Sequence, residues 1–74
     1  MSDALDKEDF SAVELDIIRM IVGVMSDKEI AFALDKPAEE ITVAVCDILS
    51  KIGTNDRSVV VFQAVSFGWV PTDL

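Results

Sequence analysis

Hydrophobic residues recur at three- and four-residue steps along most of this chain, the spacing that places side chains on one face of an α-helix. The first series follows Ser11 and Glu14, which have the spacing of a capping box, in which hydroxyl and carboxylate each accept a hydrogen bond from a backbone N–H at a helix start. The series predicts a helix from Ser11 to about Val24. Its apolar face would contain Leu15, Ile18, Ile21, Val22 and Met25.

Two further helices are expected in the middle of the chain. Ser26 and Glu29 repeat the capping box and open a short helix that Asp35-Lys36-Pro37 ends, with Pro37 suited to the first position of the next helix. The β-branched stretch 41–45 could also form a strand, but the apolar residues of this segment share helical spacing, so we expect a helix that ends at Gly53. They are Ile41, Val45, Ile48, Leu49 and Ile52.

A last helix is expected near the C-terminus. Asn55 can cap its start, and Gly68 with Pro71 would end it after Phe67. Between residues 58 and 67 the only polar side chains are Ser58, Gln63 and Ser66. They share one narrow sector of the helix, so most of its circumference is apolar.

Four predicted helices make the expected fold class all-α, with one domain at residues 10–70. The chain has 74 residues, of which 51% are hydrophobic, enough apolar material for one small core. Residues 1–9 are mostly polar, and we interpret them as a flexible acidic lead-in. Residues 71–74 are interpreted as a C-terminal tail.

The chain is strongly acidic, with a formal net charge of −8 from 14 acidic and 6 basic side chains. Such a field repels the phosphates of nucleic acids and attracts basic partners. There is no histidine, no tyrosine and no glycine loop for phosphates, and the single Cys46 cannot form an internal disulfide. We therefore expect no enzyme activity, metal, cofactor or small-molecule ligand. The lone thiol, acidic N-terminus and short apolar runs predict a cytoplasmic protein without a membrane segment.

Two segments give the chain a resemblance to the LuxR/GerE family of DNA-binding domains. Ser26-Asp27-Lys28-Glu29-Ile30-Ala31 is similar to the family's Ser-Asn-Lys-Glu-Ile-Ala, and Asp47-Ile48-Leu49-Ser50-Lys51-Ile52-Gly53 is similar to its Asn-Ile-x-x-Lys-Leu-Gly. Phe10-Ser11 with Glu14 looks like its Leu-Thr-x-Arg-Glu opening, and Arg57 falls on an arginine that the family usually carries. The resemblance spans roughly residues 10 to 70 and implies a four-helix helix-turn-helix domain whose third helix enters the major groove.

The sequence departs from the family where the family contacts DNA. Its Thr-Val-Lys-x-His segment is matched here by Glu40-Ile41-Thr42-Val43-Ala44, which has neither the lysine nor the histidine. Base edges are read by donors such as lysine, arginine and asparagine, whereas the face opposite the apolar residues of this helix offers mostly acids and alkyl groups. That face would contain Glu39, Glu40, Thr42, Val43, Cys46, Asp47 and Ser50.

We therefore expect a transcription-regulation module that acts through protein contact rather than by reading DNA. Its partner-binding residues would be Glu39, Glu40, Val43, Cys46 and Asp47. The partner would be a related LuxR-type regulator, which the chain could antagonise, or a protein of the transcription machinery. The simpler interpretation is that the acids are solvated carboxylates favoured by the helix dipole, and that Cys46 is an inert thiol.

The resemblance also implies that the last helix pairs two domains, as a homodimer or a heterodimer. One small domain cannot easily bury a helix that is apolar on most sides. The expected dimerisation residues are Val59, Val60, Phe62, Val65 and Phe67. Alternatively, the other helices wrap this helix fully, the chain is a monomer, and Trp69 covers the remaining gap.

Direct DNA binding is the alternative function. Its contacts would come from Lys28, Thr42, Lys51 and Arg57, with the acidic charge neutralised by a partner or by a further domain. Lys28, Lys51 and Arg57 are few cations against fourteen acids. The test of this alternative is an affinity that falls steeply with added salt. A decayed relative kept for its structure, or a fragment of a longer regulator, is a third interpretation.

Overall fold

Four α-helices and one short 3-10 helix make up the described part of the chain. The structure is a computed structural model that describes residues 6–70, except for the side chain of Lys7. The elements are η1 (Lys7–Asp9), α1 (Ala12–Val22), α2 (Asp27–Leu34), α3 (Ala38–Ile52) and α4 (Arg57–Ser66). Residues 6–70 contain no strand, so the expected all-α class with four helices is confirmed. Residues 1–5 of the predicted lead-in and the predicted tail 71–74 lie outside the described residues.

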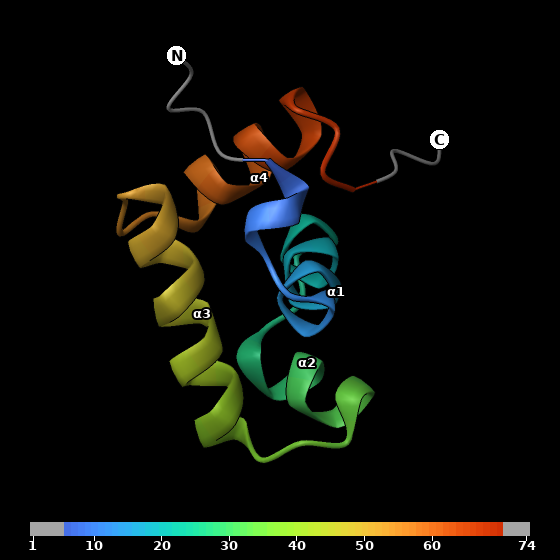
Figure 1. Ribbon diagram of the computed structural model, residues 1–74. Coiled ribbons are helices and arrows are strands. Elements are labelled where there is room, and N and C mark those ends of the chain that lie inside the picture. Colours follow the sequence, from blue (N-terminus) through green and yellow to red (C-terminus); the bar gives the residue numbers. More distant parts are fainter. Residues whose placement is uncertain (1–5, 71–74) are drawn as a thin grey trace.

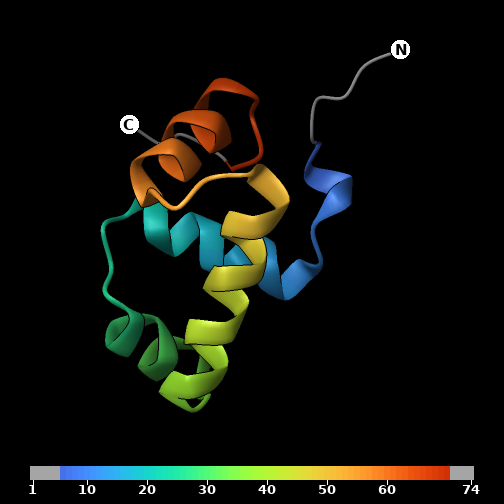
Figure 2. The ribbon, with the colours of Figure 1, turned by 90° about the vertical axis from the view of Figure 1, so that its left-hand side faces the viewer.

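The helices pack in two main pairs. In Figure 1, α3 runs along one side of the molecule, α1 is seen end-on beside it, and α4 and α2 lie at opposite ends. A quarter turn shows α1 passing behind α3 at a steep angle (Figure 2). The closest packing joins α1 to α4 and α2 to α3, while α1 also touches α3. Among the described elements, none covers the outer side of α3.

Both predicted capping boxes are present. Ser11 Oγ accepts a hydrogen bond from the N–H of Glu14 at 3.1 Å, and the N–H of Ser11 donates to Oε1 of Glu14 at 2.9 Å. Ser26 and Glu29 form the same reciprocal pair at 3.2 and 2.8 Å. Two backbone donors at each helix start are thereby satisfied, and these pairs fix where α1 and α2 begin.

The starts of α3 and α4 differ from the predictions by one residue. Pro37 is the N-cap of α3 and not its first residue, because its backbone is extended (ψ 145°) and its carbonyl accepts the first bond of the helix, from Glu40 at 3.0 Å. Asp56 caps α4 in place of Asn55, since its Oδ1 accepts from the N–H of Ser58 at 2.9 Å. Aspartate and asparagine are equally good caps, so composition could not distinguish these neighbours.

The described end of the predicted flexible lead-in is structured. Residues 7–9 form the 3-10 helix, and the following Phe10 is buried. The ring of Phe10 lies 5.0 Å from that of Trp69 between centroids, at a tilt of 55°. Trp69 in turn lies 5.8 Å from the ring of Phe67. An aromatic cluster thus joins the two ends of the described chain. Such ring contacts stabilise a fold by more than the burial of their apolar area alone.

The core is formed by one face of every α-helix. Its wholly buried large side chains are Ile17, Ile18, Ile30, Ile41, Ile48 and Val60. Each stabilises the fold by about 1.5–3 kcal/mol relative to an exposed position. Ile17 was not on the predicted apolar face of the first helix, yet it is fully buried. It lies one turn before Ile21, so α1 buries a broader face than its periodicity indicated.

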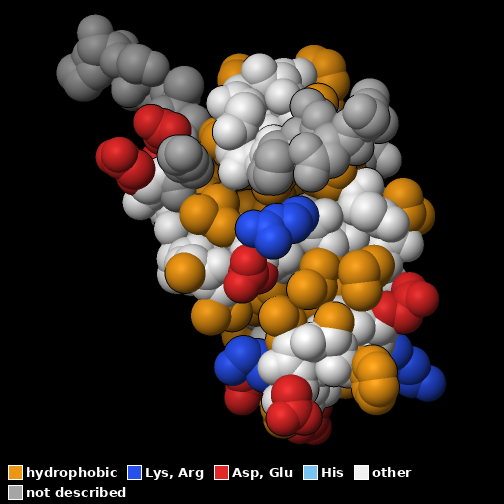
Figure 3. Space-filling view, turned by 90° about the vertical axis from the view of Figure 1, so that its right-hand side faces the viewer, with side chains coloured by type: hydrophobic (Ala, Val, Ile, Leu, Met, Phe, Trp, Pro, Cys, Tyr) orange, Lys and Arg blue, Asp and Glu red, His pale blue; other side chains and the backbone are white. Residues whose placement is uncertain are grey.

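Part of the apolar content of the chain stays on the surface. Large exposed hydrophobic side chains come from all four helices, the α1–α2 turn and the residue after α4: Val13, Val24, Phe32, Val43, Phe62, Val65 and Phe67. On the face turned away from α3, hydrophobic side chains gather across the middle among a few charged ones (Figure 3). A domain this small has too little interior for all of them.

Candidate functional site

The outer face of α3 carries the residues predicted to bind a partner. Every residue predicted on this face is exposed: Glu39, Glu40, Thr42, Val43, Cys46, Asp47 and Ser50. On the opposite face Ile41, Val45 and Ile48 are buried in the core. The predicted division of this helix into two faces is therefore confirmed. Val43 is 60% exposed, an apolar side chain in the middle of an acidic surface.

Carboxylates dominate the electrostatics of this face. Glu40 pairs with Lys36, with 3.6 Å between Oε2 and Nζ. Glu39 and Asp47 have no ion-pair partner within residues 6–70. Lys51, the only base in α3, reaches toward α1 and not across the outer face. The outer face of α3 therefore presents negative charge that its own helix does not neutralise.

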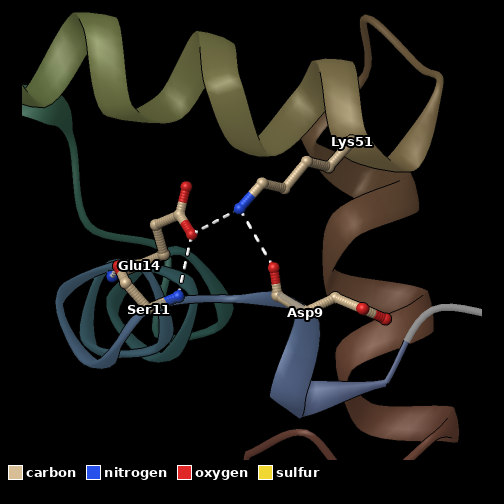
Figure 4. A network of polar contacts seen from close by, with 4 residues as sticks. All are labelled: Asp9, Ser11, Glu14 and Lys51. Atoms are coloured by element: carbon tan, nitrogen blue, oxygen red, sulfur yellow. Dashed lines mark hydrogen bonds and ion pairs between the residues drawn. The ribbon is translucent and has the colours of Figure 1, made fainter.

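Lys51 ties α3 to the N-terminal segment (Figure 4). Its Nζ lies 2.7 Å from Oε1 of Glu14, 3.0 Å from the carbonyl oxygen of Asp9 and 5.3 Å from the centroid of the Phe10 ring. The same Glu14 oxygen accepts the hydrogen bond from Ser11. Burial raises the pKa of Glu14, but the hydrogen bonds from Lys51 and Ser11 and the charge of Lys51 outweigh it, so this pKa lies below its ordinary value.

The residues proposed for DNA contact are mostly engaged within the chain. Arg57 forms an ion pair with Asp27, and Lys51 is held as described above. Thr42 Oγ1 donates to a backbone carbonyl one turn earlier in α3, at 3.1 Å. Of this predicted set, Lys28 alone has no such partner in the described chain. The four residues lie on three different helices and form no cluster of available donors.

Nearly all described basic side chains are paired with carboxylates. Besides Lys51 and Arg57, Lys36 is paired, and Arg19 lies 3.5 Å from Asp16, so four of the five are engaged. Each such surface pair is weak, worth about 0–1 kcal/mol. The effect of this pairing on the electrostatic potential around the chain is larger, because a paired base no longer offers an uncompensated positive charge to phosphates.

A shallow groove lies at the C-terminal end of α3, beside the exposed face. It has a volume of about 520 Å³ and is lined by Cys46, Leu49, Ser50, Gly53, Thr54 and Asn55. Gly53 ends the helix in a left-handed conformation (φ 85°), and the N–H groups of Gly53 and Thr54 both donate to the carbonyl of Leu49. The carbonyl oxygens of the last three residues of α3, Ser50, Lys51 and Ile52, accept no hydrogen bond within residues 6–70.

The predicted dimerisation residues of α4 are divided between surface and core. Phe62 is 68% exposed, and Val65 and Phe67 are exposed as well. Val59 is half-buried. Val60 is fully buried and belongs to the core of the monomer, so its assignment to the dimer surface was wrong. The apolar circumference of α4 is too uniform to tell in advance which valine turns inward.

The function of this chain has to be argued from its own geometry. No family model, curated protein or solved structure matches it. Within residues 6–70 no helix is long and apolar enough to cross a bilayer, and no three metal-ligating side chains gather.

Two exposed hydrophobic residues were missed by the sequence reasoning. Phe32 on α2 is 89% exposed and Val24 in the α1–α2 turn is 88% exposed. A helical wheel places Phe32 opposite Ile30 and Leu34, so periodicity could have identified it. Val24 gave no such signal because it lies in a turn. It borders a second groove, of about 440 Å³, between this turn and the start of α4.

Proposed function

We propose that this chain is a regulatory interaction module with a helix-turn-helix fold of the LuxR/GerE type, which binds another protein through the outer face of α3. The observation that carries the proposal is the pairing of the basic side chains. Four of the five described bases already have carboxylate partners, while Glu39 and Asp47 on α3 have no ion-pair partner among the described residues. A helix with this charge is unsuited to the major groove, where a reading helix lies between two rows of phosphates.

The exposed side chains of α4 support a second part of the proposal, the pairing of two domains. Phe62, Val65 and Phe67 stand on one exposed segment, and burying aromatic side chains is a main source of interface energy. We propose a homodimer, or a heterodimer with a related regulator, formed through this segment. The partner of α3 would be that regulator or a protein of the transcription machinery, and we place the module in the cytoplasm.

Titration of a labelled generic DNA duplex at low salt tests the first part. We expect no binding by the wild-type chain, because its acids repel the duplex. Binding that weakens steeply with salt would overturn the proposal and restore direct DNA contact through Lys28 and its neighbours. Changing Glu39 and Glu40 to lysine provides the matched variant. It should introduce DNA binding only if α3 can lie in the groove.

Light scattering on the same sample tests the second part. The mass should be that of a dimer. A monomer at all concentrations would overturn the pairing through α4 and leave the α3 surface to be tested alone.

A further inference from the structure

The exposed residues of α3 follow the spacing of a helix-packing seam. Glu39, Val43, Cys46 and Ser50 succeed one another at steps of four, three and four residues, and all are exposed. This alternation keeps side chains on one line along a helix and is the spacing with which two helices pack lengthwise. The seam extends over about 16 Å at 1.5 Å per residue. An exposed helix face of this length can accept a second helix that packs lengthwise against it.

The acids on and beside the seam determine the chemistry of that second helix. Glu39 and Asp47 have no ion-pair partner in the described chain, and Glu40 has only the half-buried Lys36, at 3.6 Å. A second copy of α3 would bring the same acids to the contact, and like charges placed opposite one another are destabilising. A helix with lysine or arginine beside its apolar residues would instead be attracted.

The groove at the end of α3 fits one long basic side chain. Cys46 and Leu49 supply an apolar wall for a methylene stem, and Ser50, Thr54 and Asn55 supply polar groups. The carbonyl oxygens of Ser50, Lys51 and Ile52 accept no hydrogen bond within residues 6–70. They form the negative end of the α3 dipole, where a cation is favoured. The groove shares Cys46 and Ser50 with the seam, and its carbonyl oxygens are a second feature that favours positive charge.

We infer that the partner contributes a basic amphipathic helix, which lies along α3 with an apolar residue against Val43 and Cys46, basic residues beside Glu39 and Asp47, and one long basic side chain in the terminal groove. This inference rests on the proposed function and names the kind of partner.

The probe for this inference is a synthetic fluorescein-labelled peptide of three heptads, with leucine on its seam and lysine on both flanks, titrated by anisotropy. The wild-type chain should bind it, and a peptide with glutamate in place of lysine should not bind. E39K/D47K should weaken binding by about tenfold, since two attractive pairs become repulsive. S50R, which puts a cation into the groove, should weaken it by about threefold.

The matched control is E8K/D16K, which raises the net charge by the same amount at Glu8, exposed on η1, and at Asp16, half-buried on α1 beside Arg19. It should change the affinity by less than about twofold at physiological salt, where distant charges are screened. The milder variant E39Q/D47N, whose folding is checked by circular dichroism, tests the same contacts in case the lysine variant fails to fold. It should weaken binding in the same direction.

Equal loss in E39K/D47K and E8K/D16K would show attraction by net charge alone and overturn the inference. Absence of peptide binding would also overturn it. The DNA duplex titration distinguishes failure of this inference from failure of the proposed function. If the chain binds neither the peptide nor DNA, the proposed function stands without this partner. If it binds DNA in a salt-sensitive way, the proposed function is overturned as well.

Discussion

Two residues outside the helices adopt a left-handed backbone that glycine usually provides. Val24 has φ 63° in the α1–α2 turn, and Asp35 has φ 55° at the end of α2. A short polar side chain such as that of Asp35 tolerates this region, whereas a β-branched one is crowded against its own backbone. The strain at Val24 is not offset by burial, because its side chain is almost fully exposed.

Replacing Val24 with glycine should therefore stabilise the fold. We expect the free energy of unfolding to rise by about 0.5–1 kcal/mol, the relief of left-handed strain less the extra entropy of an unfolded glycine. Urea denaturation followed by circular dichroism measures it. The matched control is Asp35→Gly, which should be close to neutral. A loss of stability in V24G would show that the exposed valine makes contacts that outweigh its strain.

The carboxyl of Glu14 makes part of the stability depend on pH. Its pKa is lowered in the folded chain from the ordinary 4.5, so its contribution is fully present above that value and is lost as the pH falls through the lowered pKa. E14Q keeps the capping geometry but removes the charge. It should cost up to about 1 kcal/mol at neutral pH and nothing in strong acid.

Denaturation curves of E14Q and wild type at several pH values test this. Glu29→Gln is the control, since Glu29 makes the same capping pair without a lysine. Its effect should be smaller and should vary less with pH. A constant difference for E14Q at all pH values would contradict the role of Lys51.

At the level of the helices, their number, order and two of their starts could be predicted from sequence. Capping boxes are local, so Ser11 and Ser26 identified the starts of α1 and α2 without knowledge of the fold. The start of α4 was misplaced because two adjacent residues could each act as the cap. The 3-10 helix before Phe10 was missed because it depends on Lys51 and Trp69, which are distant in sequence.

The cap of α4 provides a direct test of the corrected boundary. Asp56→Ala removes the acceptor for the N–H of Ser58 and should cost about 1 kcal/mol of unfolding free energy. Asn55→Ala should cost little, because Asn55 makes no capping bond to α4. Thermal melts of the two variants give the comparison. A larger loss in N55A would return the cap to the residue first predicted.

For the molecule as a whole, exposure could be predicted well for α3 and poorly for α4. The wheel of α3 has acids on one side and isoleucines on the other, and every residue predicted on its outer face is exposed. In α4 every side offers a valine or phenylalanine, and only packing against α1 decides that Val60 is buried. Two ion pairs, Lys51–Glu14 and Arg57–Asp27, could not be predicted either, because they join residues that are distant in sequence.

Variants of α4 separate pairing from folding. Phe62→Ser should weaken the proposed dimer by at least about tenfold and leave the monomer fold intact, because the side chain is mostly exposed. Val60→Ala should instead cost about 2 kcal/mol of folding stability through the cavity it leaves. Sedimentation measures the first effect and denaturation the second. An unchanged dimer in F62S would move the pairing surface elsewhere.

The aromatic cluster of Phe10, Phe67 and Trp69 also gives the chain a built-in optical reporter. Trp69 is the single tryptophan and is 5% exposed, so its emission should be shifted to the blue in the folded state and move to the red when water reaches the indole. The ring of Phe10, which packs against the indole of Trp69, comes from the opposite end of the sequence. Its intrinsic fluorescence therefore reports whether the two ends of the chain meet, while the helices report through their dichroism. A difference between the two unfolding midpoints would measure how far the closure of the ends is independent of the rest of the domain.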